Sequence, residues 1–88
     1  MDFRWIDWNI AKVERLGVRP EECDEVVGSP PHPYPIRAPD ERWLVKGPTR
    51  GRRLLQVVYL IDDDGTIFVI HARPLTAKEK HRFRRHSQ

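Results

Sequence analysis

The chain has 88 residues, of which 39% are hydrophobic and 33% are charged, and its formal net charge is +3. This length predicts a single domain over residues 1–88. The longest apolar run, at residues 54–61, is far shorter than the roughly 20 residues of a membrane-spanning helix. The N-terminus lacks the pattern of a secretion signal, and a lone cysteine, Cys23, excludes an internal disulfide. We therefore expect a cytoplasmic protein.

The first residues predict a short edge strand followed by a helix. Side chains at residues 3–7 alternate as they do in a strand. The helix is expected from residue 8 to residue 16, with Asp7 or Asn9 as its N-cap. Its apolar positions are Ile6, Ile10 and Val13, whose helical spacing predicts one buried stripe.

A second helix is predicted to begin at Pro20, because proline is favoured in the first turn, where its missing N–H is not needed. Cys23, Val26 and Val27 form its buried side, and Gly28 ends it. Residues 29–41 hold five of the eight prolines of the chain. Proline cannot donate to a sheet ladder, so this segment is predicted to be an extended connector or an edge segment.

The second half predicts an antiparallel meander, with strands at residues 42–46, 53–61 and 66–72. The pair Asp64-Gly65 favours a tight hairpin turn. Residues 54–61 and 67–70 are apolar at almost every position, which predicts strands covered on both faces. The predicted helices are too few to cover that surface, so self-association and docking of a partner are both open. The predicted fold class is α+β, with two N-terminal helices, an antiparallel meander and a basic C-terminal helix.

The C-terminal helix is predicted by a capping box, in which Thr76 caps the Glu79 N–H and Glu79 reaches back. Residues 71–88 carry six basic residues and one acidic residue. Lys78, Arg82 and Arg85 lie on one helical face. This concentration of positive charge predicts a polyanion partner, either a nucleic acid or an acidic protein, with a solvated basic tail as the alternative.

Several motifs, taken in order, resemble the BrnT-family toxins of bacterial type II toxin–antitoxin pairs. They are Trp5-Ile6-Asp7-Trp8-Asn9, Lys12, Gly17-Val18, Glu21-Glu22, Arg42, Gly47, Gly51-Arg52, Leu55, Ile70-His71-Ala72-Arg73-Pro74 and Lys78-Glu79-Lys80. The resemblance implies a RelE-like fold and a metal-independent endoribonuclease that inhibits translation without a cofactor. It also implies a BrnA-like antitoxin as partner, through which the toxin reaches operator DNA.

The sequence departs from the family pattern at four positions, which are Leu16, His71, Lys80 and Phe83. The family commonly has a histidine, a serine, an arginine and an aromatic hydroxyl there. The departures at Leu16, Lys80 and Phe83 favour a second hypothesis, a catalytically weak or inactive toxin-like protein that acts with its antitoxin in a DNA-bound autorepressing complex, whereas the retained Arg73 and the basic helix favour the enzyme. A plain nucleic-acid-binding domain is a weaker hypothesis, because the sequence has no helix-turn-helix or aromatic RNA-binding signature.

Cleavage of RNA without a metal needs a base for the 2′-hydroxyl, cations for the phosphate and an acid for the 5′-oxygen. His71 and Arg73 lie two residues apart on a strand and are predicted to share a face. Arg73 is the candidate phosphate clamp, His71 and Glu79 compete as the base, and Lys80 is a further cation. The candidate RNA contacts are Arg50, Arg52, Arg53, Lys78, Arg82 and Arg85.

Structural roles compete with these assignments. Arg73 is also suited to pairing with an acidic residue, and Glu79 has a role in the capping box. His71 is suited to a hydrogen-bonded position at a strand end, and the arginines of the 47–51 turn and its flank to solubility. No metal site is predicted.

Overall fold

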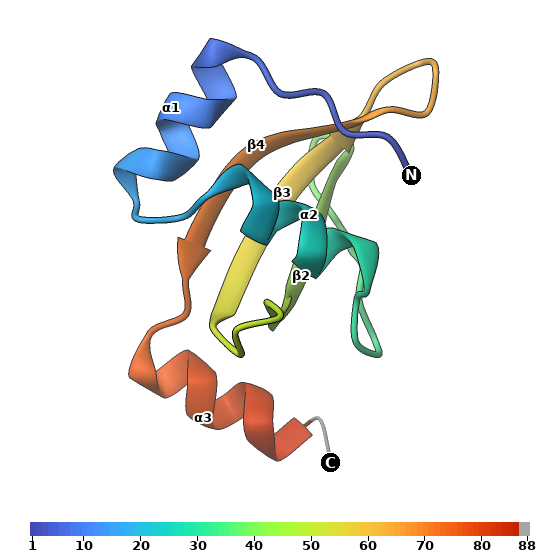
Figure 1. Ribbon diagram of the computed structural model, residues 1–88. Helices are drawn as coiled ribbons and strands as arrows, with labels where there is room; N and C mark the ends of the chain where they lie inside the picture. The colour runs from blue at the N-terminus through green and yellow to red at the C-terminus, as the bar shows by residue number, and fades with distance from the viewer. Residues whose placement is uncertain (87–88) are drawn as a thin grey trace.

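The computed structural model describes residues 1–86 and, over that range, has helices packed on an antiparallel sheet (Figure 1). The elements in chain order are α1 (Asp7–Arg15), α2 (Pro20–Gly28), β1 (Ile36–Ala38), β2 (Arg42–Pro48), β3 (Leu54–Ile61), β4 (Ile67–Pro74) and α3 (Ala77–His86). The strands pair in the order β1-β2-β3-β4, each antiparallel to its neighbour. The predicted α+β class and the meander are therefore confirmed. None of the helices within residues 1–86 is long and apolar enough to cross a membrane.

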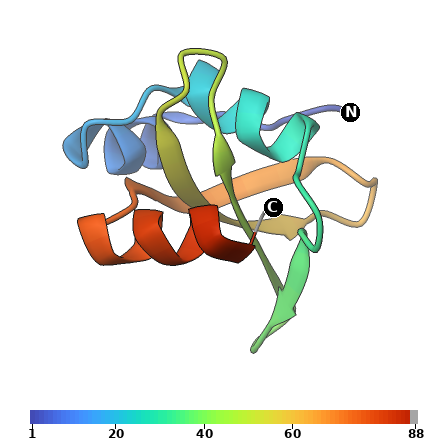
Figure 2. The same ribbon diagram turned by 90° about the horizontal axis from the view of Figure 1, so that it is seen from below.

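Helices lie on both sides of the sheet. Figure 2 shows α1 and α2 on one side and α3 on the other, near one end. We call the first side the inner face and the second the outer face. The hydrophobic core fills the space between the inner face and α1 and α2. Its buried side chains include Val13 and Cys23 from the helices and Val45, Leu55 and Val57 from the sheet.

Strand β3 is buried mainly on the inner face, with Leu54 at its start also buried. Leu55, Val57 and Tyr59 are buried, whereas the alternating residues Gln56 and Val58 are partly exposed on the outer face. Along β4 the alternation is interrupted at Ile70 and His71, which are both partly exposed where the β3–β4 register shifts. The prediction that both strands are covered on both faces is therefore wrong. An apolar sequence allows a strand to be buried on both faces, but burial also needs an element that covers each face. Here α3 covers only one end of the outer face (Figure 2).

The start of α1 also differs from the prediction. The N-cap is Ile6, not Asp7 or Asn9, and the Asn9 side chain accepts the Ile6 N–H at 2.7 Å. The Asn9 amide donates to the carbonyls of Arg4 and Val69 at 3.1 and 3.0 Å, and the side chain is fully buried. Ile6 is 43% exposed, so only Val13 of the predicted stripe is fully buried. The polar side chain of Asn9 is stable at this buried position because it is fully hydrogen-bonded, and its bond to the Val69 carbonyl links α1 to β4.

The segment before β2 is held by close packing. Its residues 36–38 form the edge strand β1, as expected for an edge segment. The Tyr34 N–H donates to the Pro31 carbonyl at 2.8 Å. A Cβ placed on Gly47 of β2 would lie 2.9 Å from the Pro31 Cδ, so only glycine lets the proline ring lie this close to the strand. The predicted N-terminal strand is reduced to a single parallel bridge between Phe3 and Ile67.

Candidate functional site

A polar row crosses the outer face beneath α3. The strand register aligns Lys46 of β2 with Gln56 of β3, and Gln56 with Arg73 of β4. Glu79, in the first turn of α3, contacts both ends of this row. The Arg73 Nη1 and Nη2 donate to Glu79 Oε1 and Oε2 at 2.7 and 2.8 Å, and the Lys46 Nζ lies 4.0 Å from Oε2. Arg73 and the cationic helix therefore meet on one side of the molecule.

Glu79 completes the capping box predicted at the start of α3. Its Oε1 accepts the Thr76 N–H at 2.9 Å, while Thr76 Oγ1 accepts the Glu79 N–H at 3.2 Å. The hydrogen bonds from Arg73, and then those of Thr76, hold the pKa of Glu79 far below its usual range. A carboxylate held ionised in this way is a weak base. The pair with Glu79 raises the pKa of Arg73, and it also neutralises the charge that a phosphate clamp needs.

His71 lies on the outer face, two residues along β4 from Arg73 of the polar row. It is aligned with Val58, as Arg73 is with Gln56, so the predicted shared face of His71 and Arg73 is confirmed. The imidazole is half-buried, and its pKa is lowered by that burial and then by the charges of Lys12 and Arg73. The ring is therefore neutral at neutral pH, as a general base must be before it takes a proton. Of the two candidate bases, the geometry favours His71.

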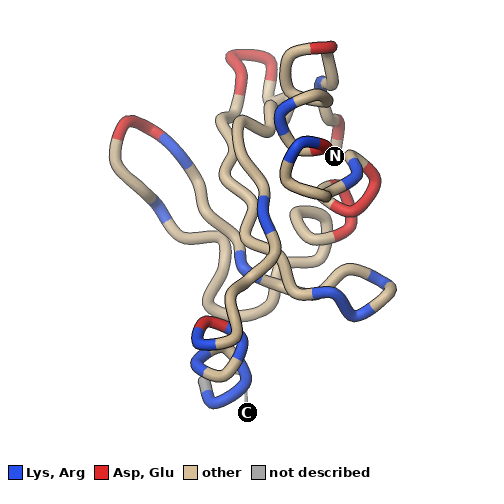
Figure 3. Tube along the Cα trace, turned by 90° about the vertical axis from the view of Figure 1, so that its left-hand side faces the viewer, with Lys and Arg blue, Asp and Glu red and all other residues tan. Residues whose placement is uncertain are grey.

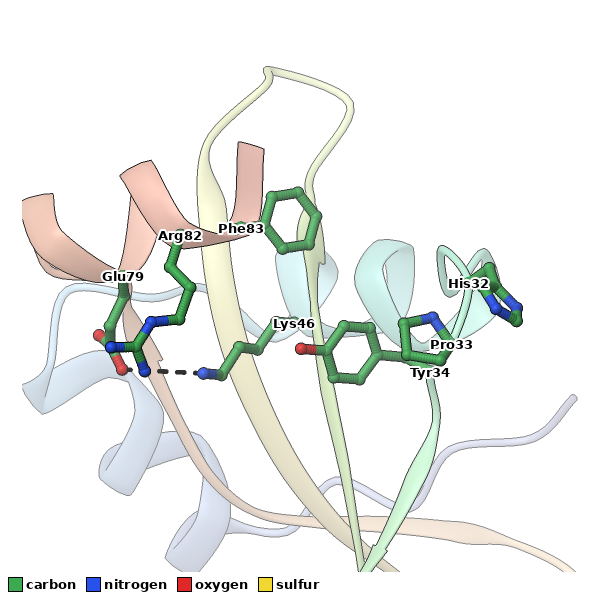
Figure 4. Close-up of a pocket in the computed structure, with 7 residues that line it drawn as sticks. All are labelled: His32, Pro33, Tyr34, Lys46, Glu79, Arg82 and Phe83. Carbon is green, nitrogen blue, oxygen red and sulfur yellow. Dashed lines mark ion pairs between the residues drawn. The ribbon is translucent and has the colours of Figure 1, made fainter. Parts of the chain in front are cut away.

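A pocket of about 400 Å³ opens between α3 and the segment before β1. Its walls include Tyr34 with residues 32–33, Lys46 of β2, and Glu79, Arg82 and Phe83 of α3. Figure 4 shows the Lys46 and Arg82 side chains reaching toward Glu79, and the two aromatic rings on the other side of the cavity. Two cations, one carboxylate and two aromatic rings therefore line a single cavity.

Two of the basic regions predicted to bind RNA diverge. Figure 3 shows α3 and the β2–β3 turn at the same end of the molecule but pointing away from each other, while the acidic 62–64 turn lies at the opposite end. Arg53 donates to Glu22 at 2.9 and 3.2 Å and to the Gly17 carbonyl at 2.7 Å. Arg53 therefore joins β3 to the α1–α2 connection, and its guanidinium is not free for RNA.

The remaining predicted RNA contacts are surface residues. Arg50 and Arg52 are exposed in the β2–β3 turn, where the Arg50 N–H donates to Glu25 at 3.0 Å. On α3, Arg82 lines the pocket, and Lys80, which was predicted as a further catalytic cation, is half-exposed. Two further cations are exposed there, namely Lys78 and Arg85.

Sequence reasoning missed Lys46 and Tyr34. Lys46 is the only charged residue between Arg42 and Arg50, which marks it as the outward side chain of a strand. No sequence signal places it beside Arg73, because that depends on the register of two strand pairs. Tyr34 lies in a proline-rich segment whose path is set by its contact with Gly47.

Within residues 1–86, no three His, Cys, Asp or Glu side chains gather as a metal site would require. No protein-family model, curated protein or solved structure matches the chain.

Proposed function

We propose that this protein is the toxin of a type II toxin–antitoxin pair, with a RelE-like fold and a metal-independent endoribonuclease activity in the cytoplasm. Its partners in this proposal are RNA and a BrnA-like antitoxin, which links it to operator DNA. The observation that carries the proposal is the position of His71, a neutral imidazole on the same face as the Lys46 and Arg82 cations. The BrnT-like motif at residues 70–74 supports it through Arg73, whereas His71 stands where the family commonly has a serine and is this chain's own candidate base.

The proposed reaction begins when His71 takes the proton of a ribose 2′-hydroxyl. The 2′-oxygen then forms a bond to the adjacent phosphorus and the bond from phosphorus to the 5′-oxygen breaks, while water protonates the departing oxygen. The products are a 2′,3′-cyclic phosphate and a 5′-hydroxyl. Lys46 and Arg82 stabilise the charge that grows on the phosphate oxygens. Arg73 acts as a positioning residue, because its two hydrogen bonds to Glu79 hold α3 over the sheet.

A defined RNA tests this proposal in the presence of EDTA. We expect the protein to cleave it and to leave a 2′,3′-cyclic phosphate, and a 2′-deoxy substitution at the cleaved position to block the reaction. His71→Ala should lower the rate by about 100- to 10,000-fold, the range that general bases contribute. Arg15→Ala, an exposed arginine at the end of α1 that is not a candidate RNA contact, is the matched control and should cleave normally. Cleavage by His71→Ala at the unsubstituted rate would refute the role of the imidazole.

A second candidate function is favoured by the Arg73–Glu79 pair, which occupies the guanidinium predicted as the phosphate clamp. In that case the chain is a toxin-like binding protein with little or no activity, which acts with its antitoxin on operator DNA. Expression without the antitoxin separates the two candidates. Growth arrest that His71→Ala relieves supports the enzyme, whereas unchanged growth together with operator binding by the toxin–antitoxin complex supports the binding protein.

The outer face beyond α3 has two proposed occupants, the antitoxin and a second copy of the chain. Its half-buried apolar side chains include Leu44, Val58 and Phe68. Light scattering of the chain alone and then with the antitoxin distinguishes a homodimer from a complex of the two proteins.

A further inference from the structure

The pocket between α3 and the segment before β1 combines features that the cleavage proposal does not use. Tyr34 lines one wall and Phe83 another, and both rings face the same cavity (Figure 4). Its volume of about 400 Å³ lies within the range of about 300–1,000 Å³ that is typical of small-molecule sites. The cavity is therefore large enough to admit a flat ring between or beside the two aromatic side chains.

Contacts outside the cavity fix the two segments that carry the Tyr34 and Phe83 rings. Tyr34 packs against the hydrophobic core, and its backbone N–H is bonded to Pro31, which in turn lies against Gly47. Burial raises the pKa of the Tyr34 phenol, so the hydroxyl stays protonated and is able to donate a hydrogen bond. Helix α3 is fixed at its first turn by the Arg73–Glu79 pair. The rings therefore belong to two anchored walls of the pocket.

Phe83 is a large apolar side chain that lies outside the hydrophobic core. In α3, which runs from residue 77 to residue 86, it is the only large apolar side chain. It is half-exposed toward the pocket instead. An aromatic ring that leaves the core on a charged helix is suited to stacking with a flat ligand.

The charges of the pocket indicate which flat ligand. Arg82 precedes Phe83 on α3, and Lys46 rises from β2 below it. The Glu79 carboxylate is bonded to Arg73 and so does not cancel both cations. Aromatic rings beside cations are the common arrangement for single-stranded nucleic acid, where the rings stack on bases and the cations bind the backbone.

We propose that this pocket holds one nucleobase of a single-stranded RNA, stacked on Phe83 and Tyr34, with an adjacent phosphate bound by Arg82 and Lys46. The inference rests on the proposed function, and it names Tyr34 and Phe83 as the residues that read the base. It follows that affinity depends on a base at one position of the strand and not only on the number of phosphates.

The test uses the full chain and a fluorescently labelled six-nucleotide 2′-O-methyl RNA, which binds but has no free 2′-hydroxyl to react. A set of six further strands carries a single abasic site at each position in turn. We expect one abasic position to weaken binding about five- to 150-fold, the fold-change that corresponds to the loss of one stacked base. Phe83→Leu should abolish this dependence, and Phe83→Tyr should keep it.

Controls and opposing outcomes separate this inference from the proposed function. Arg82→Ala should weaken the intact and abasic strands alike, because it acts on phosphate. Circular dichroism should show that Phe83→Leu folds, since Phe83 lies outside the core. If the unsubstituted protein binds none of the strands, the proposed function fails and the base pocket with it. If it binds every strand equally, or if Phe83→Leu weakens intact and abasic strands by the same factor, only the base pocket is refuted.

Discussion

Arg53 offers the sharpest distinction between a structural and an RNA-binding arginine. Its guanidinium donates to both oxygens of Glu22, a carboxylate only 6% exposed, and to the Gly17 carbonyl at 2.7 Å. Removing one partner of a buried ion pair typically costs about 3–5 kcal/mol, because the other charge stays buried without its partner. The Arg53 side chain is 40% exposed, so solvent screens part of that cost. We therefore expect Arg53→Ala to lower the free energy of unfolding by about 2–3 kcal/mol.

Urea unfolding followed by tryptophan fluorescence measures this change. Arg52→Ala is the matched control, because Arg52 is the exposed neighbour in the same turn, and it should change the free energy of unfolding by less than about 0.5 kcal/mol. The RNA affinity of folded Arg53→Ala should equal that of the unsubstituted protein. Equal stability of the two variants would contradict the structural role of Arg53, as would a loss of RNA affinity in Arg53→Ala at unchanged stability.

Three further predictions concern the site and its support. Nuclear magnetic resonance should give His71 a pKa below the usual 6.5, so cleavage should persist into mild acid. The free energy of unfolding should fall as the pH drops below the pKa of an unfolded histidine, because the unfolded chain then binds the proton more readily. A measured His71 pKa at or above 6.5 would contradict the effect of burial. Gly47→Ala should lower the free energy of unfolding by about 1–3 kcal/mol in thermal melts, since its Cβ meets the Pro31 ring, whereas Gly28→Ala faces open space and serves as the control. Asn9→Ala should cost about 2–4 kcal/mol in chemical denaturation, because it removes three hydrogen bonds at a buried position, and a loss below about 1 kcal/mol would show that water replaces them.

Local signals in the sequence were enough for most of the elements. The proline and glycine at the ends of α2 bound the helix where they were expected to, and the capping box of α3 forms between Thr76 and Glu79. Both depend on residues within a few positions of each other, so no tertiary contact is needed to read them. The cap of α1 failed as a prediction because Asn9 bonds to Val69, sixty residues away.

The candidate site divides in the same way. Alternation along one strand was sufficient to put His71 and Arg73 on one face, because successive side chains of a strand point to opposite sides. The tertiary structure alone decided that Glu79 forms an ion pair with Arg73 and that Glu22 forms one with Arg53. It also decided that Lys46 lies in the polar row. Each of these pairings depends on strand register or on the path of a connecting segment. Register and connecting paths are set by packing over the whole chain, so the local sequence does not show which residues become neighbours in space.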